Sequence, residues 1–163
     1  MPESKLVAVL KDLCRRDIRF VVVGGLAAIL HGAPGQTLDI DLVFSRDPEN
    51  IQRLLDFLGE ADAIFRIQPH RRLRPNESHL AGGGHLNLLT RYGPVDLLGT
   101  IGNNLGYADL ASHSNEMDIG QGLRIQVLDL ETIIAVKEQL GSAKDLAALP
   151  ALYQTLRQMK KSG

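Results

Sequence analysis

The stretch Leu38-Asp39-Ile40-Asp41-Leu42 places two aspartates one residue apart inside an apolar run. Alternate residues of a β-strand point to the same face, so we expect Asp39 and Asp41 to lie side by side while the apolar residues face the other way. Carboxylates are the hard oxygen ligands that Mg²⁺ prefers in proteins. The stretch therefore predicts half of a metal site on a strand.

An earlier stretch predicts the unit that precedes this strand. Phe20–Val23 is a continuous apolar run, which is typical of a strand buried on both faces. Gly24 and Gly25 follow it and allow a tight turn into a helix that contains Leu26. The sequence thus predicts a strand, a glycine turn and a helix.

The rest of the chain is predicted to alternate helices and strands. The stretch at 68–84 is the exception, because its apolar residues show no regular spacing, and it is expected to be irregular. Helices are expected over about residues 4–16, from 48, after 129 and after 142, a strand near 63–67, and hairpins within 86–98 and 116–127. We expect an α/β (α+β) fold, a mixed β-sheet flanked by helices, as one domain over residues 1–163. Its core would cover about 18–128 and its C-terminal helices about 129–160.

The composition is that of one ordinary globular domain. Of 163 residues, 44% are hydrophobic and 23% charged, and the formal net charge of −1 implies no global attraction to nucleic acid or membrane. No apolar run approaches the roughly 20 residues that span a bilayer, and residues 1–5 lack a signal-peptide pattern. We expect a cytoplasmic protein with no membrane partner, in which the single cysteine, Cys14, serves packing.

A third carboxylate lies in the run Val95-Asp96-Leu97-Leu98. A charge inside an apolar strand is costly unless it is paired or bound to a metal. Asp96 would therefore join Asp39 and Asp41 in a site for two divalent ions about 3.5–4 Å apart. The alternative is an exposed strand carboxylate without a chemical role.

Several short motifs become informative when they are taken as a set. They are Val22-Val23-Gly24-Gly25-Leu26-Ala27, His31-Gly32, Thr37-Leu38-Asp39-Ile40-Asp41-Leu42 and Gly93-Pro94-Val95-Asp96-Leu97-Leu98. In this order the chain resembles the nucleotidyltransferases of the DNA polymerase beta superfamily, over roughly residues 18–147. Its late segments Ile134-Ala135-Val136-Lys137 and Lys144-Asp145-Leu146 are similar to those of small bacterial proteins of the abortive-infection toxin type.

The resemblance implies a nucleotidyltransferase fold and a role for each matched residue. The three aspartates would bind Mg²⁺ or Mn²⁺, and Asp96 would activate the acceptor hydroxyl. Gly24 and Gly25 would let the triphosphate of an NTP approach the backbone at a helix N-terminus. Thr37 would support the loop before the metal-binding strand or contact phosphate. Lys137 and Lys144 would neutralise the charge of the triphosphate, with Asp145 orienting a lysine. The alternatives are a turn hydroxyl for the threonine and solvated side chains for the lysines.

Two departures from the family pattern bear on activity. Relatives often carry an arginine two residues before the threonine, and this chain has Gly35 there. Gly25 stands where many members have serine, a form common in antibiotic-modifying and toxin-like branches. The missing arginine implies the loss of a phosphate or structural contact, whereas Gly25 indicates the branch rather than inactivity.

Positive charge gathers in the irregular stretch of the chain. Between residues 66 and 85, four arginines and three histidines accompany one acid, Glu77. Arg71, Arg72 and Arg74 are candidates for binding the phosphates of an acceptor, and a solvated loop is the alternative. Few aromatic residues accompany them, so a base-stacking platform is not predicted.

Together these features predict a metal-dependent nucleotidyltransferase that moves an NMP group from an NTP to RNA, tRNA or protein, in a toxin–antitoxin setting with a cognate antitoxin as partner. Two alternatives stay open. One is an antibiotic-modifying nucleotidyltransferase, and the other is a non-catalytic nucleotide-sensing or partner-binding module of the same fold.

Overall fold

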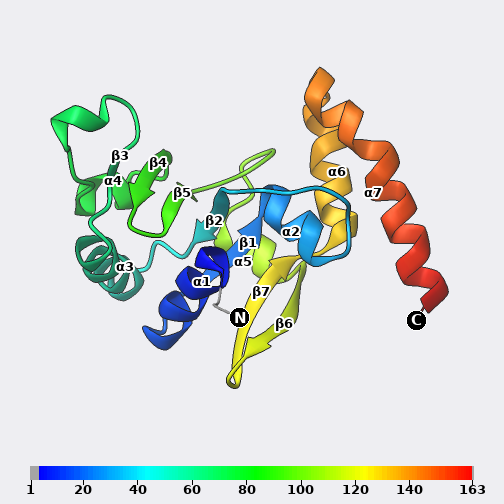
Figure 1. Cartoon of the computed structure of the whole chain (residues 1–163). Helices are drawn as coiled ribbons and strands as arrows, with labels where there is room; N and C mark the ends of the chain where they lie inside the picture. Colours follow the sequence, from blue (N-terminus) through cyan, green and yellow to red (C-terminus); the bar gives the residue numbers. More distant parts are fainter. Residues whose placement is uncertain (1–3, 163) are drawn as a thin grey trace.

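The computed structural model describes residues 4–162, which form a seven-stranded mixed sheet with helices packed around it (Figure 1). Residues 1–3, part of the segment expected to lack a signal-peptide pattern, and residue 163 lie outside the described residues. The strands are β1 (Phe20–Val23), β2 (Ile40–Phe44), β3 (Ile64–Phe65), β4 (His85–Thr90), β5 (Gly93–Leu98), β6 (Ser114–Gly120) and β7 (Leu123–Leu128). The helices are α1 (Lys5–Arg15), α2 (Gly24–Leu30), α3 (Pro48–Glu60), α4 (Glu77–Ala81), α5 (Tyr107–Ala111), α6 (Leu130–Leu140), α7 (Ala143–Ser162) and a 3₁₀ turn, η1 (Pro69–Arg71).

The strand order across the sheet is β3-β4-β5-β2-β1-β7-β6. The three central strands are β5, β2 and β1, with β2 parallel to β5 and antiparallel to β1. The antiparallel hairpins β4–β5 and β6–β7, both expected from the sequence, extend the sheet on its two sides. The expected α/β fold with a mixed, antiparallel-edged sheet is therefore confirmed.

The apolar strand β1 lies at the centre of the core, and all four of its side chains are buried. β2 and β7 pair with its two edges, and α2 and α5 contact it. The register pairs Val23 with Asp41, so the glycine turn that follows β1 lies beside the start of β2. This register places the Gly24-Gly25 turn next to the strand that carries Asp41.

Side-chain caps and burial explain where the longer helices begin and end. Ser4 accepts a hydrogen bond from the Val7 amide at 3.2 Å at the start of α1, and Asp129 caps α6 as expected, through the Thr132 amide at 2.7 Å. His31 ends α2, and its Nε2 contacts the Leu128 carbonyl at 2.8 Å.

Among residues 4–162, no helix is both long and apolar enough to cross a membrane.

The structure differs from the sequence prediction in three short elements and one long one. η1 and α4 fall in the stretch expected to be irregular, and α5 was not anticipated, because three- and five-residue elements are too short for periodicity to show. α7 continues through Pro150, although proline cannot donate the backbone hydrogen bond of a helix interior. The helix continues there because Leu149 and Leu152 on either side are buried in the core.

A small polar network ties α1 to α3 and to the turn between β4 and β5. Asp12 accepts hydrogen bonds from Arg16 and from the Tyr92 hydroxyl, both at 2.8 Å, and Arg16 also contacts Glu60 of α3. Burial alone would raise the pKa of Asp12, but the two hydrogen bonds outweigh it and lower that pKa below its ordinary value of 3.8. The charged form of Asp12 therefore stabilises the folded state.

Asp12→Asn is expected to lower the free energy of unfolding at pH 7 by about 1–3 kcal/mol, because a charge that accepts two hydrogen bonds is lost. Since the folded-state pKa of Asp12 is depressed, this contribution is full above 3.8 and is lost as the pH falls through the folded-state value. Urea unfolding at pH 7 and about pH 3 measures both effects. The control is Asp56→Asn. The carboxylate of Asp56 is exposed and accepts one hydrogen bond, from the Gln52 amide at 3.3 Å. Equal losses in the two variants, or a loss independent of pH, would contradict this account.

Candidate active site

Two of the predicted aspartates face each other at the centre of the sheet. The parallel register of β2 and β5 places Asp41 directly opposite Asp96. Burial, then the hydrogen bond and charge of Asp96, then the charge of Asp39 raise the pKa of Asp41 to about 6, against an opposing effect of Arg66. The site thus concentrates negative charge that a cation would relieve.

Asp39 is not on the strand, and this corrects the expected alternation. β2 begins at Ile40, and Asp39 is exposed in the loop before it. The Thr37 hydroxyl is within 3.2 Å of both the amide and the carbonyl of Asp39, so this segment forms a local turn rather than a ladder. Leu38, expected to share the apolar backing of the strand, is 82% exposed. Thr37 thus has the geometry expected of a loop support.

Gly24 is the point of closest approach between the glycine turn and the aspartates. Its φ is +69°, and a Cβ built on it would lie 2.2 Å from Asp41 Oδ2. A Cβ on Gly25 would meet Thr37 only at 3.9 Å, an ordinary contact. The first position of α2 therefore needs glycine for conformation and for space, whereas the second position tolerates a side chain.

A cleft of about 160 Å³ opens on this group between the sheet and α6. Its polar edge contains Gly24, Asp41, Lys137 and Asp145. The remaining lining is apolar: Val23, Leu98, Ile101, Leu128, Ile133, Val136 and Leu140. Nζ of Lys137 lies 3.7 Å from Oδ1 of Asp145, whose pKa is lowered by a hydrogen bond from Ser142 and then by this lysine. Lys144 is exposed and does not line the cleft.

The arginine-rich segment lies on the other side of the aspartates, beyond β3 and β4 (Figure 1). Arg71, Arg72 and Arg74 are exposed, and Arg74 makes a 3.5 Å contact with Asp62. Arg66 behaves differently, because its Nη2 lies 2.8 Å from Asp96 Oδ1. The sequence suggested only a general cationic patch, since this contact depends on the pairing of β3 with β4, which no local pattern predicts.

The predicted metal ligands are only partly gathered. Among residues 4–162, no group of three or more His, Cys, Asp or Glu side chains is positioned to hold a metal ion. Asp41 and Asp96 are adjacent, and Asp39 is near enough for its charge to act on Asp41. The three-aspartate metal set stays a prediction, and the donors present fit a cation held by two carboxylates with other oxygens from phosphate or water.

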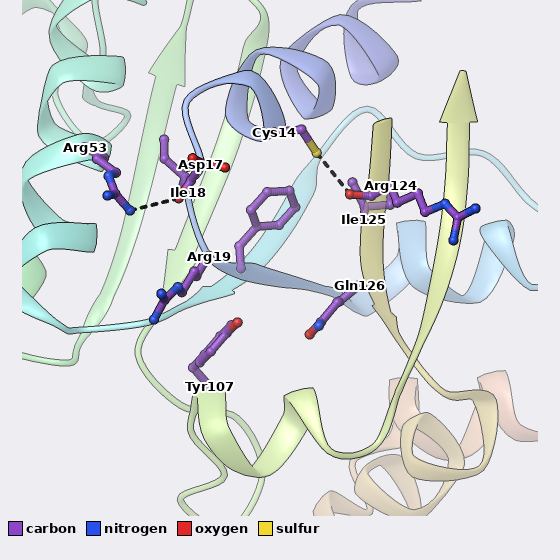
Figure 2. Close-up of a pocket in the computed structure, with 10 residues that line it drawn as sticks. Cys14, Asp17, Ile18, Arg19, Arg53, Tyr107, Arg124, Ile125 and Gln126 are labelled. Carbon is purple, nitrogen blue, oxygen red and sulfur yellow. Dashed lines mark hydrogen bonds between the residues drawn. The ribbon is translucent and has the colours of Figure 1, made fainter. Parts of the chain in front are cut away.

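A larger cavity, of about 450 Å³, lies at the opposite end of β1 from the glycine turn (Figure 2). Tyr107 and Gln126 extend toward one another there, whereas Arg19 points away from Gln126, and Arg53 donates to the Asp17 carbonyl at 3.3 Å. The Cys14 thiol donates to the Arg124 carbonyl at 3.3 Å, and burial raises its pKa, so Cys14 packs as expected. None of the described residues lining this cavity is a predicted site residue. The volume of a cavity therefore does not by itself identify the candidate active site.

Gly24→Ala is expected to destabilise the protein by about 2–4 kcal/mol, because the new methyl would meet Asp41 and the backbone would be held at a positive φ. Gly25→Ala, its matched control, is expected to change the free energy of unfolding by less than about 1 kcal/mol. Chemical denaturation at one pH measures both. Similar losses in the two variants would show that the close approach at Gly24 is not a constraint.

Asp41→Asn is expected to stabilise the metal-free protein at pH 8 by about 1–3 kcal/mol, because ionisation of Asp41 is disfavoured in the folded state. The folded-state pKa of about 6 exceeds the ordinary 3.8, so the cost applies above pH 6 and disappears toward pH 4, where Asp41 is neutral. Unfolding at both pH values, with Asp56→Asn as control, measures this difference. A destabilised variant at pH 8, or a pH-independent gain, would refute it.

Comparisons with known proteins support the fold. No family model matches the sequence, and no curated protein matches it. The lincosamide antibiotic adenylyltransferase LnuA, solved with lincomycin, is similar with a TM-score of 0.60 and 15% identity, over 95% of this chain and 98% of that one.

Two further solved structures share the fold. A candidate nucleotidyltransferase from Thermotoga maritima gives a TM-score of 0.55 and 21% identity, over 100% of this chain and 97% of that one. An antigenic nucleotidyltransferase-like protein from Paracoccidioides brasiliensis gives 0.51 and 18%, over 90% and 72%. The sheet, the glycine turn and these likenesses together show that the chain has the nucleotidyltransferase fold.

Proposed function

We propose that the protein is a metal-dependent nucleotidyltransferase that moves an NMP group from an NTP to an acceptor hydroxyl. The observation that carries the proposal is the Asp41/Asp96 pair on adjacent parallel strands beside Gly24, within this fold. Paired carboxylates with no cation between them are electrostatically unfavourable, and sites for phosphoryl transfer are built in this way. Fold likeness alone would not carry the proposal.

Each residue of the site has a part in the proposed reaction. Asp41 and Asp96, with Asp39 from the loop, would hold Mg²⁺ or Mn²⁺, which when bound supplies charge neutralisation to the triphosphate. The acceptor oxygen forms a bond to the α-phosphorus, the bond from that phosphorus to the bridging oxygen breaks, and pyrophosphate leaves. Asp96 takes the proton of the acceptor hydroxyl. Gly24 and Gly25 keep side chains away from the triphosphate.

The donor and acceptor sides of the site would lie on opposite sides of the aspartates. Lys137 faces the cleft from α6 and is held by Asp145, so it would meet the triphosphate. Lys144, which is exposed, would act only at longer range. Arg71, Arg72 and Arg74 lie beyond β3 and would bind an anionic acceptor such as RNA or tRNA. A protein acceptor and a cognate antitoxin are the other partners proposed for a toxin-type setting.

An antibiotic-modifying transferase is a second candidate, favoured by the likeness to the lincosamide adenylyltransferase over nearly the whole length of both chains. The apolar lining of the cleft beside Asp41 would suit a partly apolar acceptor. The exposed arginines favour an anionic acceptor instead, because they would repel a cationic drug. The two candidates therefore differ in the charge of the acceptor.

The proposed function is tested by incubating the protein with each of the four labelled NTPs and Mg²⁺ or Mn²⁺, and with tRNA, protein or lincosamide and aminoglycoside acceptors. Transfer of label is expected, and Asp41→Asn and Asp96→Asn should each reduce its rate by about 10²-fold or more. The exposed Asp56→Asn should retain the wild-type rate.

Each outcome of this screen has a distinct meaning. Label on RNA that declines as salt rises would support the arginine-rich segment as the acceptor surface. Label on a drug would support the antibiotic-modifying alternative. Nucleotide binding without transfer to any acceptor would identify a nucleotide-sensing module, and absence of nucleotide binding with either metal would reject the proposal.

A further inference from the structure

Arg66 is fixed at both its backbone and its guanidinium. It follows β3, and its amide donates to the Asn87 carbonyl at 2.9 Å. Its Nη1 donates to the Leu88 carbonyl at 3.0 Å, and its Nη2 donates to Asp96 Oδ1 at 2.8 Å. One backbone and two guanidinium hydrogen bonds leave the side chain little freedom, so it extends across β4 and ends at β5.

The pair that Arg66 forms is more shielded from water than the other ion pairs of the arginine-rich segment. The side chains of Arg66 and Asp96 are 33% and 15% exposed, whereas those of Arg74 and Asp62 are 51% and 66% exposed. A charge-assisted hydrogen bond at 2.8 Å in such a setting is a strong interaction. Shielding an ion pair from water has a desolvation cost that can exceed the gain in stability. The presence of this pair therefore points to a role beyond stability.

Asp96 lies between two groups of opposite character. On one side it meets Arg66, and on the other it meets Asp41. A site for two divalent ions needs a further carboxylate that is free to bind the second ion. Here one oxygen of that carboxylate already contacts a guanidinium, and the described residues provide no cluster of three metal-binding side chains.

We infer that Arg66 is a positioning residue that holds Asp96 and supplies there the positive charge that a second divalent ion would supply, so that the site binds a single ion. The inference rests on the proposed function. Arg66 would hold Asp96 Oδ1 and leave the other oxygen of Asp96 for the bound ion and the reacting hydroxyl. A merely structural arginine would anchor β3 to β4 without affecting the number of bound ions.

The test counts Mn²⁺ ions bound per chain, by electron paramagnetic resonance of the free ion, in the presence of a non-hydrolysable NTP analogue. One ion is expected for the wild-type protein. Arg66→Gln frees Asp96 and is expected to bind two, whereas Arg66→Lys keeps the charge and is expected to bind one. Arg124→Gln removes an exposed arginine that contacts Glu116 at 3.6 Å, far from the aspartates, and is expected to bind one.

The outcomes separate this inference from the proposed function. Two ions on the wild-type protein, or one ion on Arg66→Gln, would overturn the role of Arg66 and leave the transferase proposal standing. No binding of Mn²⁺ or nucleotide by the wild-type protein would overturn both. If Arg66→Gln fails to fold, a count of two ions on the wild-type protein or on Arg66→Lys would still overturn the inference.

Discussion

The packing of the Asp41 carboxylate against the backbone of Gly24 is the constraint on which the site depends. A side chain at Gly24 would overlap Asp41, and the positive φ there turns the chain from β1 into α2. The antiparallel register of β1 and β2 sets this approach, and the parallel register of β2 and β5 adds Asp96. These two strand pairings thus bring separated sequence motifs together into one acidic group.

The electrostatics of this group follow from the same geometry. Asp41 is half-buried beside Asp96 and within reach of the charge of Asp39, so its ionised form is disfavoured, and Arg66 offsets part of the repulsion. Ionisation of Asp41 in the folded protein therefore has a cost, which partial burial and the neighbouring carboxylates cause. Binding a cation and an anionic nucleotide together would release that cost, which is a physical reason for the two to bind as a unit.

Apolar runs and turn residues in the sequence correctly predicted those site residues whose positions depend on local strand and turn geometry. Phe20–Val23, the glycine turn and the β4–β5 hairpin carry strong strand and turn signals, so the positions of Gly24, Asp41 and Asp96 followed from them. Asp39 was misplaced because the Thr37 hydroxyl competes for its backbone and ends the strand early. The contact of Arg66 with Asp96 depends on pairing between distant segments, and no spacing in the sequence encodes that partner.

A crystal structure of the protein with Mn²⁺ and a non-hydrolysable NTP analogue tests the central claim most directly. The account predicts anomalous scattering from Mn²⁺ beside Asp41 and Asp96, with the triphosphate over Gly24 and Gly25. Nucleotide bound instead in the cavity near Arg19 and Tyr107, or Mn²⁺ away from the two carboxylates, would contradict it.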